Sequence, residues 1–141
     1  MDQQAHIATF IEQHHLLTLC ASFQSNLWCA NCYYAFDKQT MALYIMTSPE
    51  SRHGKLMICN KFISGTIAPE PDDINDIQGV QFSGEVKLLE MEEAKNAENI
   101  YNQRFPIAKK IPSSLWKITL NELKMTDNRI KFGFKLSWQR Y

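Results

Sequence analysis

The chain has 141 residues, of which 45% are hydrophobic and 21% charged, and its 15 basic and 15 acidic residues give a formal net charge of zero. This length fits one globular domain over residues 1–141, and the neutral balance argues against nucleic-acid binding, which normally needs a basic excess. No apolar run reaches the roughly 20 residues that cross a bilayer. The amino terminus also lacks the basic and apolar regions of a secretory signal, so we expect a cytoplasmic protein with no membrane partner.

The first half of the sequence predicts a helix, four strands and a short second helix. Apolar residues at helical spacing, with Asp2 as a candidate cap, predict the first helix. Alternating apolar residues between turn residues predict strands over residues 17–23, 27–36, 41–47 and 62–69. Pro49 fits the first position of the second helix, which we expect to continue to Ile58.

The second half predicts the longest helix and three more strands. Apolar spacing predicts the helix over residues 91–105, and Pro106 stops it. The same alternation predicts strands over residues 78–90, 116–120 and 130–138. Gly84 falls on the apolar face of the first of these, where a glycine suggests a bulge or a close backbone approach. Seven strands joined mostly by short turns, with two to three helices, indicate a mainly β (α+β) fold, an antiparallel barrel of six to seven strands.

Two of the four cysteines form a C-x-x-C motif, Cys29 and Cys32, within a predicted strand. Residues three apart on a strand point to opposite faces, so these two thiols cannot hold one zinc ion. Cys20 and Cys59 are isolated in the sequence and supply no second pair. We therefore predict free thiols and no metal site.

The segment LYIMTSPESRHGKLM carries the strongest chemical signal. An apolar strand runs into Thr47 and then into a helix start that bears Ser51, Arg52, His53 and Lys55. Hydroxyls, a forked guanidinium and the free N–H groups of a helix start can together bind an anion such as phosphate. An ordinary solvated first turn of a helix would show the same residues. The chain has neither G-x-G-x-x-G nor G-x-x-x-x-G-K-[ST], which argues against Rossmann and P-loop nucleotide sites.

The order of these segments resembles the FMN-binding split barrels of the pyridoxamine 5'-phosphate oxidase-like superfamily. The S-R-H helix start, the long strand with an internal glycine and the Trp-led strand WKITLNELKMTDN follow one another as they do there. More narrowly, LWCANCYYAFD, GVQFSGE, YNQRFPIAK and FGFKLSWQR are similar to the YhbP-like bacterial branch of that superfamily.

This resemblance implies a homodimer that holds FMN between its subunits, with the flavin phosphate on the Arg and the basic residue after it. The candidate cofactor-binding residues are Tyr44, Thr47, Ser51, Arg52, His53, Lys55 and Gln78. His53 stands where the superfamily commonly has Lys, which makes the phosphate contact pH-dependent. Superfamily oxidases often place Gln where this chain has Gly79. Gln78 flanks that position and Gln81 lies nearer the strand glycine, and we take Gln78 as the candidate for a contact with the flavin ring.

Two functions remain open. The first is an FMN-binding protein that acts as a flavin-dependent oxidoreductase on an unidentified small substrate. The second is a non-catalytic homodimer that binds haem, another cofactor or none. The ending KFGFKLSWQRY lacks the superfamily's Arg-x-His substrate segment, which argues against pyridoxamine phosphate oxidation. A homodimer is also expected because the aromatic strand surface exceeds what a small barrel buries; its residues are Trp28, Tyr33, Tyr34, Phe132, Phe134 and Trp138.

Overall fold

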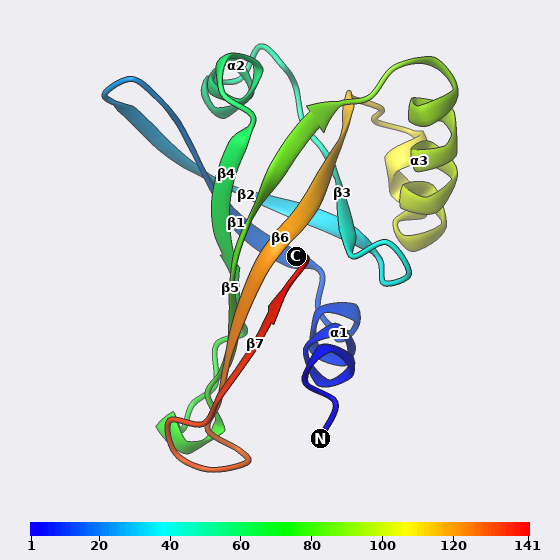
Figure 1. The fold of residues 1–141 in the computed structure, drawn as a ribbon. Helices are drawn as coiled ribbons and strands as arrows, with labels where there is room; N and C mark the ends of the chain where they lie inside the picture. The colour runs from blue at the N-terminus through cyan, green and yellow to red at the C-terminus, as the bar shows by residue number, and fades with distance from the viewer.

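The computed structural model describes residues 1–141 and contains three α-helices, seven strands and two short 3-10 helices (Figure 1). The first half contains α1 (Gln3–Gln13), β1 (Leu16–Phe23), β2 (Asn26–Asp37), β3 (Ala42–Met46), α2 (Arg52–Cys59) and β4 (Phe62–Ile67). The second half contains η1 (Ile74–Asp76), β5 (Gln78–Leu88), α3 (Met91–Arg104), η2 (Pro106–Lys109), β6 (Leu115–Asp127) and β7 (Lys135–Gln139). None of the helices is long and apolar enough to span a membrane.

The strands form one antiparallel sheet in the order β3-β2-β1-β4-β5-β6-β7, and β3 also pairs with β6. That extra pairing closes six strands into a barrel and leaves β7 outside the ring. The first part of β6 pairs with β3 up to Thr119, and from Glu122 onward its partner is β7. The predicted antiparallel split barrel is therefore confirmed.

A β-bulge lies where β6 changes partner. The register between β5 and β6 shifts at Ser83 and Gly84, so Asn121 has no direct partner on β5. A Cβ atom on Gly84 would lie 2.5 Å from the carbonyl oxygen of Thr119, which only glycine avoids. The predicted bulge and close approach at this glycine are both confirmed. The Arg140 side chain donates to the carbonyl of Leu120 and to those of Thr40 and Met41, which ties the chain end to this point.

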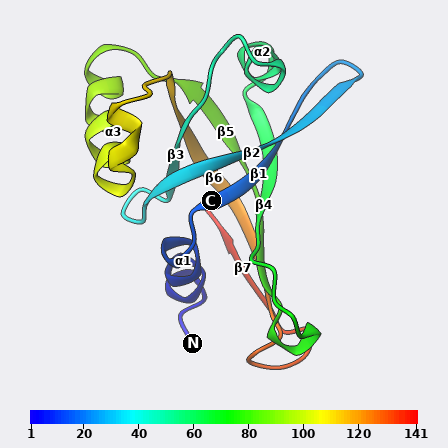
Figure 2. The ribbon, with the colours of Figure 1, turned by 180° about the vertical axis from the view of Figure 1, so that it is seen from behind.

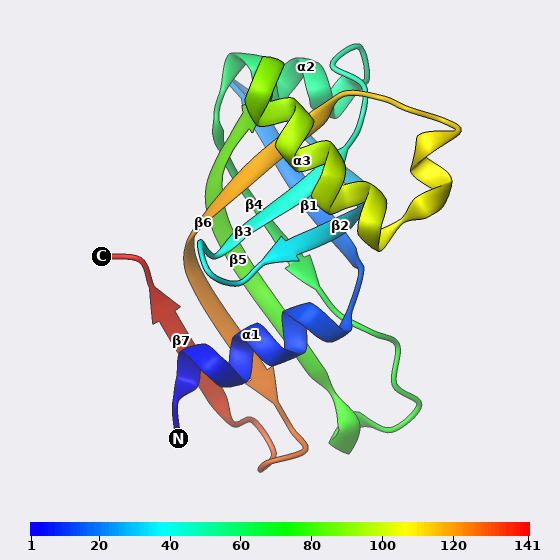
Figure 3. The same ribbon diagram turned by 90° about the vertical axis from the view of Figure 1, so that its right-hand side faces the viewer.

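Helix α1 covers one end of the barrel and lies beside β7 (Figure 3). Asp2 caps it as predicted, accepting a hydrogen bond from the N–H of Ala5 at 3.1 Å. Its apolar stripe, Ile7, Phe10 and Ile11, is buried in the main core. The hydroxyl of Tyr34 donates to the carbonyl of Ile11 at 2.7 Å and is buried with it, so Tyr34 does not belong to the exposed aromatic surface expected above.

The hairpin of β1 and β2 extends beyond the barrel, and α2 lies close to it (Figures 1 and 2). The amide of Asn60, which follows α2, donates to the carbonyl of Ser22 on β1 at 2.8 Å. Helix α3 covers a different side, where it buries a second apolar cluster with β2, β3 and β6 that includes Tyr44, Ala97 and Tyr101. The hairpin and α2 therefore form a unit of their own, away from α3.

Three predicted boundaries are wrong. The strand predicted over residues 116–120 continues to Asp127, because the bulge at Asn121 shifts the alternation of buried residues without ending the strand. The last strand begins at Lys135 rather than near residue 130, and Ile130 and Phe132 are exposed. The side chains of Asp127 and Asn128 accept hydrogen bonds from the N–H groups of Arg129 and Gly133, which builds a turn there instead. Pro49 lies in the turn before α2, because the Ser51 hydroxyl caps the helix two residues later.

Candidate functional site

Helix α2 begins at the residues that the sequence singles out as an anion site. Ser51 is its cap, and its Oγ accepts a hydrogen bond from the N–H of Gly54 at 3.1 Å. The N–H groups of Arg52 and His53, the first two residues of the helix, have no acceptor within it. An anion at this end would meet two backbone donors and the positive end of the helix dipole.

Gly54 lets the helix close tightly on the preceding turn. A Cβ atom at this position would lie 2.3 Å from the carbonyl oxygen of Ser48 and 2.9 Å from the Cα of Pro49. Both neighbours are backbone atoms, which cannot move aside as a flexible side chain could. The glycine therefore fixes the turn and the helix start relative to each other.

His53 is held inside this turn rather than free in solvent. Its Nε2 lies 2.7 Å from the Thr47 hydroxyl and 3.3 Å from that of Ser51. Ser51 already donates its hydrogen to the carbonyl of Ser48 at 2.6 Å, so we assign the hydrogen between His53 and Ser51 to Nε2. In this tautomer Nε2–H also donates to Thr47, whose own hydroxyl hydrogen is then free for a ligand.

Burial lowers the pKa of His53 below its ordinary value of 6.5, so the imidazole is neutral at pH 7. Thr47 is held in place by its backbone: its N–H donates to Ser114 at 2.9 Å, and its carbonyl accepts from the indole of Trp116 at 2.8 Å. Trp116 is itself buried in the main core. The backbone of Thr47 is therefore held from two sides, which fixes the position from which its hydroxyl projects.

Arg52 lies on an aromatic ring of the hairpin. Its guanidinium carbon is 3.7 Å from the ring centroid of Trp28, which is 44% exposed. Stacking uses the face of the guanidinium and leaves its in-plane N–H groups free to donate to a phosphate. The sequence placed Trp28 only in the aromatic strand surface that a homodimer is expected to cover. Strand alternation gives the face on which it lies but not the helix that meets it.

The structure brings Thr47, Ser51, Arg52 and His53 together at the start of α2, with Lys55 one turn further along the helix, and places Tyr44 and Gln78 elsewhere. Tyr44 is buried beneath α3, where burial, together with the charges of Asp37 and Glu93, raises its pKa. Lys55 is exposed on α2.

Gln78 lies at the start of β5, at the other end of the barrel from α2 (Figure 1). Its amide donates to Asp127 at 3.1 Å, and its oxygen accepts from Arg129 at 3.3 Å. In a single chain it is therefore remote from Arg52.

A separate cavity of about 590 Å³ lies beside α3 and η2. Seven of its ten lining residues are hydrophobic, and the other three are His15, Arg104 and Ser113. The ring of His15 stacks on that of Tyr33, with centroids 5.6 Å apart, and Phe105 packs against the other aromatics of this wall. The cavity can take an apolar, flat ligand with an acidic group. Single-residue signals in the sequence do not reveal it, because its residues come from four separate segments.

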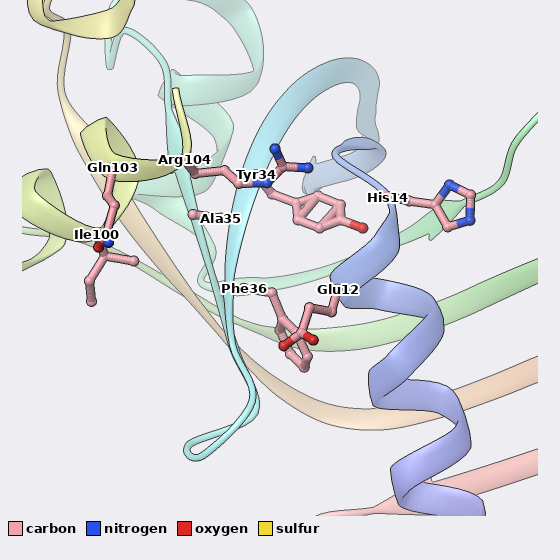
Figure 4. A pocket seen from close by; sticks show the side chains of 8 residues that line it. All are labelled: Glu12, His14, Tyr34, Ala35, Phe36, Ile100, Gln103 and Arg104. Carbon is pink, nitrogen blue, oxygen red and sulfur yellow. The ribbon is translucent and has the colours of Figure 1, made fainter. Parts of the chain in front are cut away.

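A smaller cavity of about 260 Å³ lies between α1, β2 and α3 (Figure 4). Glu12 and Arg104 approach it from the two helices, on either side of Tyr34, while the ring of His14 points away (Figure 4). Charges of opposite sign line this space, so it is not selective for an anion.

The predicted placement of Cys29 and Cys32 on opposite faces of one strand is confirmed. Cys29 is exposed and Cys32 is buried, on opposite faces of β2. Burial raises the pKa of the Cys32 thiol to about 11, so it stays protonated at neutral pH. No group of three or more His, Cys, Asp or Glu side chains lies close enough to hold a metal ion.

Comparison with known sequences identifies close relatives. The chain is 47% identical over 139 residues to a UPF0306 protein of Serratia proteamaculans, an alignment that spans 99% of this chain and 96% of that protein. It is 46% identical over 134 residues to a UPF0306 protein of Yersinia enterocolitica, with 95% and 91% covered. No protein-family model matches the chain. The family name states no activity.

Solved structures share the fold at low sequence identity. A haem-binding protein from Mycobacterium smegmatis has a TM-score of 0.84 at 17% identity over 99% of this chain, which spans 58% of that protein's length. An FAD-binding protein from Mesorhizobium loti scores 0.72 at 11% identity, with 96% and 93% covered. A pyridoxamine 5'-phosphate oxidase-like protein from Listeria innocua scores 0.70 at 18% identity, with 86% and 96% covered. The chain thus has the split-barrel fold of these proteins.

Proposed function

The chain belongs to the UPF0306 family, and from that premise we propose that it is an FMN-binding protein whose flavin phosphate lies at the start of α2. The observation that carries this proposal is the Arg52 guanidinium, stacked on Trp28 beside two unpaired helix N–H groups. A phosphate there would accept bonds from the Arg52 fork, from these N–H groups and from the Thr47 hydroxyl. The FAD-binding neighbour with the same fold supports a flavin as the ligand.

The residues present fit a flavin phosphate by their chemistry, because the Arg52 guanidinium carries positive charge and the Thr47 hydroxyl and two helix N–H groups can donate hydrogen bonds to it. Arg52 would bind the phosphate and His53 would orient the Thr47 hydroxyl toward it. When bound, FMN supplies hydride or electron transfer, which makes the chain a flavin-dependent oxidoreductase on a small substrate. The protein contributes binding and orientation.

We further propose that the site is completed by a second copy of the chain. Three large apolar side chains are 58–65% exposed: Leu27 on the hairpin, and Ile58 and Phe62 around the end of α2. The hydrogen bond between Asn60 and Ser22 joins the end of α2 to the hairpin. An exposed apolar surface of this kind, here at the opposite end of α2 from the phosphate site, is one that a homodimer covers. A second copy could bring Gln78 to the flavin ring, which one chain alone keeps away from α2. Sedimentation at micromolar concentration should give a dimer, and a stable monomer would contradict this part of the proposal.

A second candidate ligand is haem, favoured by the cavity of about 590 Å³ beside α3. Imidazole is a common ligand of haem iron, and an arginine can pair with a propionate, so His15 and Arg104 would serve these roles. The haem-binding protein with the same fold supports this candidate.

Titration of the purified chain with FMN and, separately, with haem distinguishes the two ligands. The FMN proposal predicts saturable quenching of flavin fluorescence and no stoichiometric haem band. A Soret band at one haem per chain that is lost in His15→Ala, without FMN binding, would favour the second candidate. A chain that takes up neither ligand would contradict both.

A further inference from the structure

Cys20 and Cys29 lie directly opposite each other on β1 and β2. The two strands are joined by a two-residue loop, and their register places both thiols on the same outer face of the hairpin. Thr18 and Asn31, the next pair on that face, are close enough for a hydrogen bond of 2.7 Å between their side chains. Sequence spacing does not reveal this pair, because the C-x-x-C motif associates Cys29 with Cys32, whereas the pairing with Cys20 depends on the strand register.

The hydrogen-bond pattern defines the kind of pair that the two cysteines form. The N–H of Tyr34 donates to the carbonyl of His15 at 3.0 Å, which marks this couple as a hydrogen-bonded pair. Such pairs alternate with non-hydrogen-bonded ones along an antiparallel ladder, so five positions further along the register Cys20 and Cys29 form a non-hydrogen-bonded pair. Opposed Cα atoms in such pairs are about 4.5 Å apart, which lies within the range of about 4.4–6.8 Å that disulfides span.

The two thiols are near enough to influence each other and open enough to react. Cys29 is exposed and Cys20 is partly exposed. Burial raises the pKa of the Cys20 thiol, and its hydrogen bond with Cys29 raises it further. The remaining cysteines have no such neighbour, since Cys32 faces the core and Cys59 lies at the end of α2.

We propose that Cys20 and Cys29 form a reversible intramolecular disulfide with small-molecule disulfides of the glutathione type as the oxidant. The exposed Cys29 thiolate attacks one sulfur of the oxidised ligand, forms a mixed disulfide and releases one glutathione thiolate. The Cys20 thiolate then attacks the Cys29 sulfur and releases the second glutathione thiolate. The protein loses two electrons and two protons, and the glutathione disulfide becomes two thiols.

The disulfide would link β1 to β2, and β2 is the strand whose Trp28 ring stacks on Arg52. Exposed disulfides are more easily reduced than buried ones, and disulfides of reducing compartments are usually transient or redox-sensing. The pair would therefore rest as a dithiol and close under oxidation. This inference does not depend on which ligand binds at α2.

The test is oxidation of the full chain in a series of reduced and oxidised glutathione mixtures, followed by alkylation of free thiols and peptide mass spectrometry. We expect a product that is two hydrogens lighter, in which the segment containing Cys20 is linked to the one containing Cys29. Cys20→Ser should abolish the link and leave glutathione on Cys29, whereas the matched variant Cys59→Ser should leave the link unchanged. Serine suits the wet outer face, and circular dichroism checks that each variant folds.

Two results would overturn the proposal. One is glutathione on Cys29 at equal levels in wild type and Cys20→Ser, with no linked peptide at any ratio. The other is a disulfide between two chains through Cys29, which would show that its partner is another molecule rather than Cys20.

Discussion

The guanidinium carbon of Arg52 lies 3.7 Å from the ring centroid of Trp28, which joins the start of α2 to the extended hairpin of β1 and β2. The stack holds a long, flexible cation in one orientation while its N–H edges stay open. Removing the ring should therefore free the arginine without removing its charge. The contribution of the stack to ligand binding can be measured separately from that of the charge.

Trp28→Ala should weaken FMN binding by about 0.5–2 kcal/mol, the range of a cation–π contact between exposure and burial. Trp28→Phe should retain most of the affinity because it keeps an aromatic face. Isothermal titration of both variants measures the difference. Unchanged affinity in Trp28→Ala would show that the stack does not position Arg52 for the ligand.

The contribution of His53 should depend on pH in a defined direction. Burial lowers its pKa below 6.5, so it is neutral at pH 8 and gains charge only as the pH falls below about 6.5. A bound phosphate favours the charged form, so wild type should gain affinity over His53→Gln in that acidic range only. The ratio of the two FMN dissociation constants, measured from about pH 5.5 to 8, gives this result. A ratio that does not change with pH would mean that His53 acts only by holding Thr47.

Gly54→Ala should distort the start of α2, because its Cβ would lie 2.3 Å from the carbonyl oxygen of Ser48. Overpacking against backbone costs about 1–3 kcal/mol of unfolding free energy, and FMN binding should weaken with it. Gly79→Ala is a matched control, since the nearest atom to its Cβ would be 3.6 Å away. Denaturant unfolding of the two variants compares them. Equal stabilities would contradict the close contact at Gly54.

Asp127 should stabilise the fold at neutral pH and lose this effect in acid. Burial by itself would raise its pKa, but hydrogen bonds from His6, Gln78 and the N–H of Arg129 lower the pKa below its ordinary value. Its contribution is therefore full above about pH 4 and is lost as the pH falls through the folded-state pKa.

Asp127→Ala should cost about 1.5–3 kcal/mol at pH 7, and the difference from wild type should shrink in acid. Asp72→Ala, in an exposed loop, is the control and should cost little. Urea unfolding across this pH range provides the measurement. A cost for Asp127→Ala that stays constant down to the lowest pH would argue against the ionised carboxylate as its source.

Most of the fold follows from local sequence signals. Alternation and turn residues gave the seven strands, and the glycine on the apolar face of β5 marked the bulge at Gly84. The pattern failed at residues 130–134, where alternating aromatics mimic a strand. There the side chains of Asp127 and Asn128 bind nearby backbone N–H groups and form a turn, a local competition that hydrophobic alternation does not register.

The site could be predicted only in part, because it depends on contacts between distant segments. The S-R-H segment identified the residues that meet at α2, since they are neighbours in sequence. The stack of Arg52 on Trp28 and the pairing of Cys20 with Cys29 arise from the hairpin register, which sequence patterns leave undetermined to within a residue. Tyr44 was placed correctly on β3, but its side chain faces the cluster beneath α3.

The most direct test of FMN binding at α2 is titration of FMN and of riboflavin, which lacks the phosphate, against wild type and Arg52→Ala. Loss of the charge-assisted fork should weaken FMN binding by roughly 2–4 kcal/mol and leave riboflavin binding unchanged. Lys55→Ala, which removes an exposed cation from the same helix, controls for general charge and should have a much smaller effect. Equal weakening of both flavins by Arg52→Ala, or no weakening of either, would show that the start of α2 does not hold the phosphate.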